Sequence, residues 1–354
     1  MFVIILDESK PLKSKLVISF IVLLVAVGAM LINSCRKPRT ETTPIEFVVP
    51  NGFPQPVYNF AANPLTEEGF QLGKKLFFER RLSIDGNHPC ASCHQPVAAF
   101  TTFEHDRSHG YNFSHTLRNA PGLFNLAWYR EYRWDGSTAD LATIYRSHIT
   151  DPHEMAETIS NVIDKIKNDD TYKQMFKAAF GDEKVTEDRM YKALTQFVTS
   201  LVSANSKYDK MLRGEVSFTS EEQAGYTIFK AKCATCHTEP LFTDFSYRNV
   251  GLEKDLNLND DGRMRVTGNR ADSLKFRVPS LRNCELTSYY THDGRLNVFR
   301  RMIQHYRFGV NQGPTLDPLL TNGIQLTNQQ EDQLVAFIRT LSDSAFLNNP
   351  RFRE

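Results

Sequence analysis

The hydrophobic positions of the chain form two stripes with the spacing of an amphipathic helix. Each stripe repeats apolar residues at positions i, i+3, i+4 and i+7, so that they share one helix face. The first stripe consists of Leu194, Phe197, Val198 and Leu201, and the second consists of Leu334, Phe337, Ile338 and Leu341. We therefore predict two related helices, one around residues 194–201 and one around residues 334–341.

Capping residues predict where further helices begin. Thr66 precedes one apolar-periodic segment, and Thr219 or Ser220 precedes a second. Hydroxyl side chains favour helix starts because they accept hydrogen bonds from free backbone N–H groups. Thr327 and Gln330 have the spacing of a capping box before the last helix. Each half of the chain is thus expected to begin and end with a capped or amphipathic helix.

Strand signals are scarce between these helices, and Gly, Pro, Asn and Asp punctuate long loops at residues 100–125 and 243–275. The pattern predicts an all-α fold with long irregular connections. Lys and Arg number 42 against 41 Asp and Glu, and no basic run with interleaved aromatic residues occurs. Nucleic acid is therefore not expected as a partner.

Residues 1–35 have the order of an export signal. Three lysines precede an apolar run, and small residues follow it up to Cys35. The last residues of this segment are similar to a bacterial lipobox, in which the cysteine is lipidated. An uncleaved anchor and plain secretion remain alternatives. We expect residues 36–62 to be a tether and the folded part to lie on the periplasmic side of a bacterial membrane, attached only through its N-terminus.

Four of the six cysteines lie in two short motifs. Six cysteines in an exported chain would ordinarily suggest disulfides. However, Cys90-Ala-Ser-Cys93-His94 and Cys233-Ala-Thr-Cys236-His237 are complete C-x-x-C-H motifs, which attach c-type haem. The two thiols bond to one porphyrin, and the adjacent histidine binds its iron. A redox dithiol would need no histidine, and a zinc site would combine both cysteine pairs. We therefore expect two covalently bound haem c groups.

The haem motifs and the apolar stripes form an internal repeat. Each stripe begins about one hundred residues after a haem histidine, at a distance of 100 residues in the first half and 97 in the second. A single stripe would indicate only core packing. Its recurrence predicts two tandem cytochrome c-like domains, an N-terminal haem domain over residues 63–213 and a C-terminal haem domain over residues 214–354.

These features resemble the bacterial diheme cytochrome c peroxidase family, whose relatives include MauG. The resemblance covers nearly all of the chain from Leu65 onward. Besides the haem motifs, it rests on Leu72-Gly73-Lys74-Lys75-Leu76-Phe77-Phe78, Arg118-Asn119-Ala120-Pro121, Trp134-Asp135-Gly136, Asp151-Pro152-His153-Glu154-Met155, Leu241-Phe242-Thr243-Asp244, Val278-Pro279-Ser280-Leu281-Arg282-Asn283 and His292-Asp293-Gly294. In that family the N-terminal haem reacts with hydrogen peroxide, and the C-terminal haem receives electrons from a small periplasmic donor, a cytochrome c or a cupredoxin.

The resemblance implies roles for residues near the first haem. His94 would hold the iron that reacts with peroxide, and Glu154 would be the acid–base group that moves the proton of the peroxide. Trp134 would lie between the two haems and shorten the electron path. His148 stands where many relatives have Pro, and Ile144 stands where many have Gln. His148 is a candidate second acid–base group, a candidate displaceable iron ligand, or a histidine at the rim of the pocket.

The resemblance also implies a sixth ligand for the second haem, whose iron His237 would hold. Tyr306 stands fourteen residues after His292 of the H-D-G motif, as it does in the MauG-like branch of the family. Peroxidases of the best-known type carry Met at that position. A phenolate ligand lowers the reduction potential of the iron, whereas a thioether raises it. Met302 and His305 remain rivals, because Met302 lies one helical turn from Tyr306.

The resemblance further implies one calcium ion between the two domains. Its ligands would be the side chain of Asn119 and the backbone carbonyls of Thr287 and Tyr289, since calcium prefers oxygen donors. The family usually has Pro where Tyr289 stands, but a carbonyl donor survives that change.

The loop histidines His105, His109 and His115 are further candidates for a displaceable ligand of the first iron. None of them stands at the spacing expected for that role. We interpret them as solvated loop residues.

Three functions remain to be separated. The first is peroxide reduction with electrons entering through the C-terminal haem. The second is a MauG-like oxidation of Trp or Tyr on a partner protein, which Tyr306 favours. The third is a diheme electron carrier, which Ile144 mildly favours and Glu154 opposes, because a carrier needs no acid–base group. The sequence does not decide the oligomeric state, and a homodimer is left open.

Overall fold

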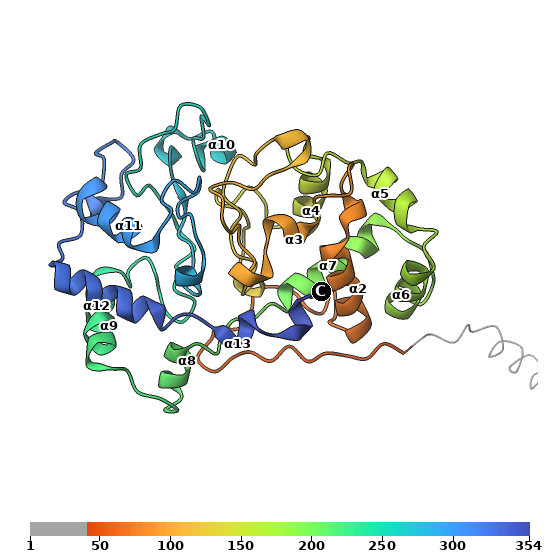
Figure 1. The fold of residues 1–354 in the computed structure, drawn as a ribbon, viewed down its shortest axis with the longest axis horizontal. Helices are drawn as coiled ribbons and strands as arrows, with labels where there is room; N and C mark the ends of the chain where they lie inside the picture. The colour runs from red at the N-terminus through yellow and green to blue at the C-terminus, as the bar shows by residue number, and fades with distance from the viewer. Residues whose placement is uncertain (1–40) are drawn as a thin grey trace, which may run out of the picture. The chain divides into compact units, whose positions relative to one another are not determined.

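The computed structural model describes residues 41–354 (Figure 1). The export signal and Cys35 therefore lie outside the described residues, and the predicted tether is described only from Glu41. In this part of the chain every helix falls short of the length and apolar character that a membrane crossing requires.

Helices and long loops make up nearly all of the described chain, and strands are confined to one short pair. The helices are α2 (Glu67–Phe78), α3 (Cys90–Cys93), α4 (Leu141–Thr150), α5 (Ile159–Ile166), α6 (Asp170–Phe180), α7 (Glu187–Thr199), α8 (Lys207–Leu212), α9 (Ser220–Lys232), α10 (Met264–Thr267), α11 (Phe299–Gln304), α12 (Asn328–Arg339) and α13 (Ser344–Leu347). Strand β1 (Tyr247–Arg248) pairs antiparallel with β2 (Phe276–Arg277). The prediction of a mainly helical fold with long irregular connections is confirmed.

The predicted helix starts are confirmed at atomic detail. The Thr66 side chain accepts a hydrogen bond from the backbone N–H of Gly69 at the start of α2. Thr219, rather than Ser220, caps α9, and it forms a capping box with the third residue of that helix. Thr327 forms the predicted capping box before α12. Each cap satisfies N–H groups that the helix itself leaves free.

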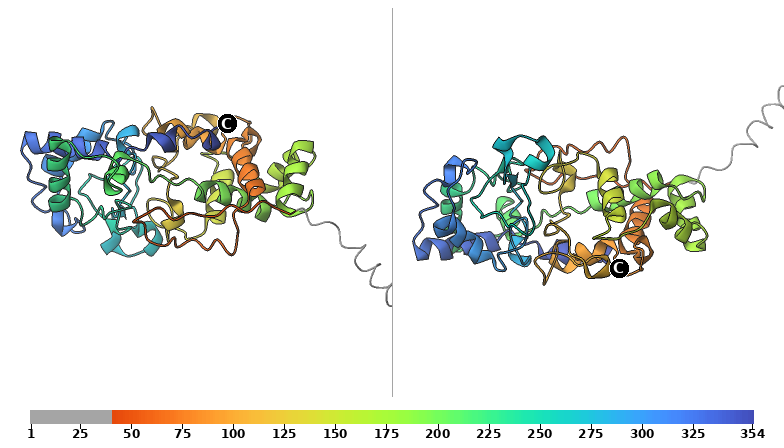
Figure 2. Two further views of the ribbon diagram at one scale, coloured as in Figure 1. Left: turned by 90° about the horizontal axis from the view of Figure 1, so that it is seen from below. Right: turned by 90° about the horizontal axis from the view of Figure 1, so that it is seen from above.

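The same helix crossing occurs in both halves of the chain. Helix α2 packs on α7 in the first half, and α9 packs on α12 in the second, as the views of Figures 1 and 2 both show. A Cβ added to Gly73 of α2 would lie 1.9 Å from the Ala193 carbonyl oxygen of α7. A Cβ added to Gly225 of α9 would lie 1.9 Å from the Gln333 carbonyl oxygen of α12. Both crossings therefore depend on a glycine that lets the two backbones approach.

The predicted stripes supply the apolar cores. The side chains of the first stripe are buried in a cluster around α2 and α7, and those of the second are buried in a cluster around α9 and α12. Phe346 and Phe352, near the C-terminus, belong to the first cluster. The Phe346 ring lies 5.9 Å from the Phe100 ring, centroid to centroid. The end of the chain thus returns to the core of the first half, where Figure 1 marks the C-terminus beside α2 and α7.

Candidate active site

The first C-x-x-C-H motif forms one helical turn followed by an oriented histidine. Cys90 and Cys93 are the first and last residues of α3, and His94 ends that helix. The His94 Nδ1 atom lies 3.0 Å from the Phe100 carbonyl oxygen, so Nδ1–H donates and Nε2 keeps its lone pair. Burial lowers the pKa of His94 to about 4, so the imidazole is neutral at neutral pH. A neutral imidazole with a free Nε2 is the form that binds iron.

The second motif has the same local arrangement. Helix α9 leads directly into Cys233, and His237 follows three residues further on, after Cys236. The His237 Nδ1 atom lies 3.1 Å from the Phe242 carbonyl oxygen. Burial lowers the pKa of His237 as well, and its Nε2 atom again keeps the lone pair that can bind iron.

The donor sets of both motifs fit a covalently attached haem. All four motif cysteines are free thiols. Burial raises the pKa of Cys90 and of Cys233 to about 12, so both thiols are uncharged at neutral pH. Each motif therefore offers two free thiols and one neutral, oriented imidazole, which are the groups that c-type haem attachment requires.

His148 and Glu154 form a pair close to the first motif. His148 lies on α4, and its Nδ1 atom contacts Glu154 Oε2 in the turn after the helix. Both residues act on the motif. Burial raises the pKa of Cys93, and Glu154 raises it further; burial lowers the pKa of His94, and His148 lowers it further. A carboxylate beside an imidazole is a chemically competent acid–base pair.

A hairpin over residues 108–116 supports the backbone of Glu154. The Tyr111 N–H donates to the Glu154 carbonyl oxygen at 2.7 Å, and Ser114 Oγ donates to the His153 carbonyl oxygen at 2.9 Å. A Cβ added to Gly110 would lie 1.9 Å from that same His153 oxygen. Only glycine permits so close an approach, so the hairpin and the Glu154 turn pack backbone to backbone.

Trp134 lies where the two halves of the chain meet. Its Nε1–H donates to the Asn119 carbonyl oxygen at 2.9 Å. Its own carbonyl oxygen accepts a hydrogen bond from the Arg277 N–H of β2 at 2.7 Å. The half-buried indole is therefore fixed to a loop of the first half, and the Trp134 backbone to a strand of the second.

Tyr306 lies in a π-helical turn, His305–Gly309, that continues α11. Such turns frequently occur at functional sites. Burial raises the pKa of Tyr306, and the nearby thiols of Cys233 and Cys236 raise it further, so Tyr306 lies in the neighbourhood of the second motif. The rival His305 is buried, and its Nε2 atom lies 2.8 Å from the Val250 carbonyl oxygen. That contact engages Nε2 of His305 and leaves Nδ1 as its remaining ligand atom.

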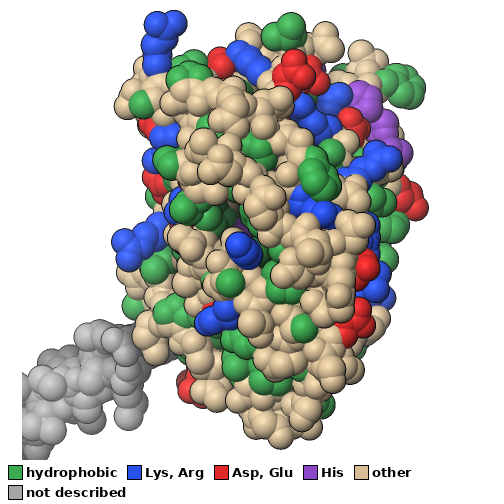
Figure 3. Space-filling view, turned by 90° about the vertical axis from the view of Figure 1, so that its left-hand side faces the viewer, with side chains coloured by type: hydrophobic (Ala, Val, Ile, Leu, Met, Phe, Trp, Pro, Cys, Tyr) green, Lys and Arg blue, Asp and Glu red, His purple; other side chains and the backbone are tan. Residues whose placement is uncertain are grey.

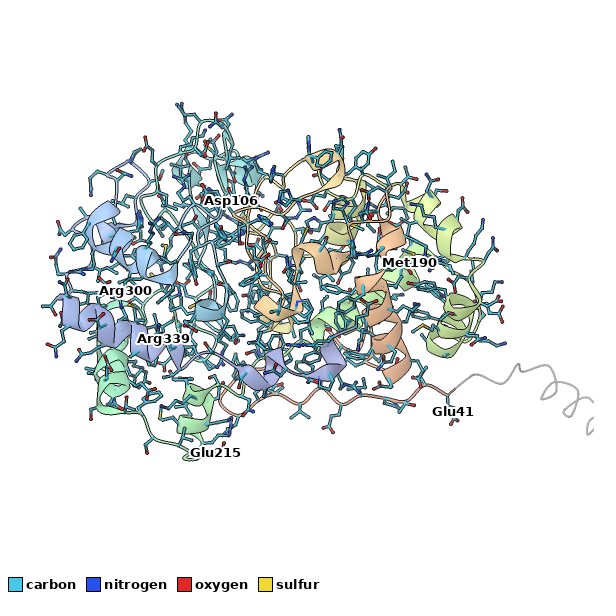
Figure 4. All side chains as sticks on the ribbon, in the orientation of Figure 1. Glu41, Asp106, Met190, Glu215, Arg300 and Arg339 are labelled. Atoms are coloured by element: carbon cyan, nitrogen blue, oxygen red, sulfur yellow. The ribbon has the colours of Figure 1, made fainter. Side chains whose placement is uncertain are left out.

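Two of the three oxygen donors expected for calcium keep an acceptor position, and the calcium site stays a prediction. The buried Asn119 donates through Nδ2 to the Asp106 carbonyl oxygen at 2.8 Å, which leaves its Oδ1 atom as a donor for an ion. The Thr287 carbonyl oxygen accepts the Tyr290 hydroxyl at 2.6 Å and retains a second lone pair. Asp106 is labelled in Figure 4, near the boundary between the two halves.

Arg118 is a structural residue of this region to which the sequence assigned no role. Its guanidinium pairs with Asp135, next to Trp134, and with Asp260 of the second half, each at 2.6 Å. Arg118 belongs to the family motif Arg118-Asn119-Ala120-Pro121, but no sequence spacing predicts its pairing with Asp260. This ion-pair network holds the Trp134 segment against the second half.

The surface agrees with the near-neutral composition. On the face drawn in Figure 3, basic and acidic side chains are interspersed, and neither sign covers a broad area.

Comparisons with known proteins agree with this arrangement. The sequence model of the family described as di-haem cytochrome c peroxidase matches residues 67–217. The methylamine utilization protein MauG of Methylophilus methylotrophus is 32% identical over 306 residues, which cover 85% of this chain and 89% of that protein. The cytochrome c551 peroxidase of Nitrosomonas europaea is 34% identical over 286 residues, which cover 80% of this chain and 82% of that protein.

A solved structure has a similar fold over most of the chain. It is described as a MauG-like protein associated with microbial copper homeostasis. The TM-score is 0.78 at 30% sequence identity, and the match covers 87% of this chain and 99% of the other.

Proposed function

Since the chain belongs to the di-haem cytochrome c peroxidase family, we propose that it reduces hydrogen peroxide to water, with electrons that enter from a small periplasmic donor at the second haem. Family membership makes the protein an oxidoreductase of the peroxidase type and implies two c-type haems. The tandem haem domains, residues 63–213 and 214–354, are part of this proposal. The proposal also includes export of the chain, a lipid anchor at Cys35 and a position on the periplasmic side of the membrane.

The contact between His148 and Glu154 beside the first motif carries the proposal. When bound, the haem iron supplies the centre at which peroxide is reduced. Peroxide binds best as its anion, so Glu154 Oε2 takes its proton and returns a proton to the oxygen that departs as water. His148 Nδ1 orients that carboxylate and shares the proton. An electron carrier would need neither group.

Electrons must cross from the second haem to the first. One peroxide molecule takes two electrons and two protons and leaves as two molecules of water. The Trp134 indole donates to Asn119 of the first half, and the Trp134 backbone carbonyl accepts from Arg277 of the second half, which supports a place for Trp134 between the haems. We assign Trp134 to this electron path. A calcium ion held by Asn119, Thr287 and Tyr289 would stabilise the same boundary.

Tyr306 is proposed as the sixth ligand of the second haem. We expect Tyr306→Phe to change the absorption and EPR spectra of the second haem only, because the thiols that act on the pKa of Tyr306 are Cys233 and Cys236 of the second motif. Met302→Leu serves as the matched control and should leave both spectra unchanged. The assignment fails if Tyr306→Phe has no spectral effect and Met302→Leu alters the second haem.

A MauG-like oxidation of Trp or Tyr on a partner protein is the second candidate function. Two observations favour it, the presence of Tyr306 near the second motif and the similarity to proteins named MauG or MauG-like. In that reaction a partner side chain supplies the electrons, and peroxide is still the oxidant. The acid–base pair near the first motif would serve both functions.

A steady-state assay separates the functions. We expect the mature, haem-loaded protein to consume peroxide with reduced cytochrome c or a reduced cupredoxin, two donor molecules oxidised for each peroxide. Consumption only in the presence of a partner protein, with oxidised Trp or Tyr found by mass spectrometry, would identify the MauG-like reaction instead. If no condition led to peroxide consumption, the diheme electron carrier would be the remaining function.

A further inference from the structure

Three histidines lie close together at the hairpin that supports Glu154, His109 and His115 within it and His105 just before its first residue. The rings of His105 and His109 lie 4.5 Å apart, centroid to centroid, and those of His109 and His115 also lie 4.5 Å apart. All three side chains are exposed. Neither the function proposed above nor the haem motifs use them.

The backbone of the hairpin brings two of these side chains together. His109 and His115 face each other across an antiparallel bridge. The flanking hydrogen bonds run from Gly110 N–H to the Ser114 carbonyl oxygen and from Thr116 N–H to the Ser108 carbonyl oxygen. His109 and His115 are therefore a non-hydrogen-bonded pair, the type whose side chains approach most closely. Their proximity follows from the backbone and not from a chance rotamer.

The three imidazoles are available as ligands. The hydrogen bonds of the hairpin engage its backbone and hydroxyl groups and leave these rings outside them. Burial lowers the pKa of His109, and the neighbouring rings of His105 and His115 lower it further. A neutral imidazole binds Zn²⁺, Cu²⁺ or Ni²⁺, and three imidazoles with water complete a common zinc site.

We propose that His105, His109 and His115 form a binding site for a divalent transition-metal ion of the zinc or copper type. Between residues 41 and 354, no group of three or more His, Cys, Asp or Glu side chains stands as placed in a position to hold a metal ion. The proposed site therefore forms when the exposed rings rotate onto the ion. Such rotations of exposed side chains take picoseconds to nanoseconds, so they present no kinetic barrier to binding.

The position of the site connects it to the first haem motif. Ser108, next to His109, hydrogen-bonds with Thr102 Oγ1 at 2.5 Å, and Thr102 Oγ1 donates to the Cys93 carbonyl oxygen at 3.3 Å. On the other side of His109, the hairpin holds the Glu154 backbone through Tyr111. An ion bound across His109 and His115 would restrict the two strands that support Glu154. The binding itself does not depend on any function proposed for Glu154.

The test is a calorimetric titration of the mature, haem-loaded protein with ZnCl₂, in a calcium-containing buffer without chelator. We expect one Zn²⁺ per chain, and we expect the double variant His109→Ala/His115→Ala to weaken binding at least about tenfold. His153→Ala is the matched control, because His153 is also exposed and lies beside the hairpin, and it should bind as the wild type does. Zn²⁺ binding that the double variant leaves unchanged, or that His153→Ala abolishes equally, would overturn the proposal.

A second measurement uses only the wild-type protein, so that it does not depend on how the variants fold. Diethyl pyrocarbonate modifies exposed imidazoles, and mass spectrometry locates each modified residue. We expect Zn²⁺ to protect His105, His109 and His115 and to leave His153 reactive. Equal modification of His105, His109 and His115 with and without Zn²⁺ would contradict the proposed metal site.

Discussion

Glu154→Gln is expected to slow peroxide turnover by about 100-fold or more while both haems stay attached. The amide keeps the size of the side chain and its contact with His148, but it cannot accept the proton of peroxide or return it to the departing oxygen. Stopped-flow measurement of the reaction of the haem-loaded variant with peroxide tests this directly. The absorption spectrum of the same sample shows whether both haems are present.

Glu183→Gln is the matched control for that experiment. Glu183 is an exposed acid of the same half, and its carboxylate pairs with Lys177 at 3.3 Å, far from the haem motifs in the sequence. The control should turn over peroxide at the wild-type rate. If Glu154→Gln also did so, His148 or another group would have to move the proton, and Glu154 would lose its assigned role.

Arg282→Met is expected to lower the free energy of unfolding by about 3–5 kcal/mol. Arg282 is fully buried, and its guanidinium forms two hydrogen bonds to the carboxylate of Asp209, at 2.8 and 2.9 Å. Its Nε–H donates to the Pro240 carbonyl oxygen at 2.8 Å, in the loop that follows the second haem motif. Methionine fills similar space but leaves the Asp209 carboxylate buried without its partner. Denaturant unfolding of the haem-loaded protein measures the loss.

The pH dependence of unfolding provides a second readout for the same pair. Burial alone would raise the pKa of Asp209, but the Arg282 guanidinium outweighs it and holds the pKa below its ordinary value. The stabilisation is therefore complete above the unfolded pKa of Asp, about 3.9, and is lost as the pH falls through the folded pKa. In Arg282→Met this part of the acid sensitivity should disappear.

Arg301→Met is the control for Arg282→Met, because Arg301 is exposed on α11. It should change the free energy of unfolding by no more than about 0.5 kcal/mol. Equal stability of Arg282→Met and Arg301→Met would show that the buried ion pair does not stabilise the second half.

The helices that frame the two haem motifs were predictable because local signals specify them. Thr66, Thr219 and Thr327 cap helices through bonds to residues only three positions away. The apolar stripes repeat with the helical period, so their burial follows from a short window of sequence. The close crossings at Gly73 and Gly225 were not predicted, since they depend on which backbone lies opposite each glycine.

The arrangement of the loops was not predictable in the same way. His148 contacts Glu154 across a turn after α4, and Arg118 reaches Asp260 from 142 residues away. Irregular backbone has no period, so a sequence pattern does not tell which polar side chains its turns bring together. The resemblance supplied the candidates Glu154 and Trp134, and the structure supplied their partners. The cross-strand pair of His109 and His115 likewise became visible only when the hairpin was known.

The haem content of the purified mature protein tests the central claim most directly. The account requires iron porphyrin to be bonded at both Cys-x-x-Cys-His motifs, since the acid–base pair, the electron path and the Tyr306 ligand all depend on it. Pyridine haemochrome analysis against protein concentration should give two covalently bound haem c groups per chain. A colourless protein, or one that holds a single haem per chain, would contradict the account.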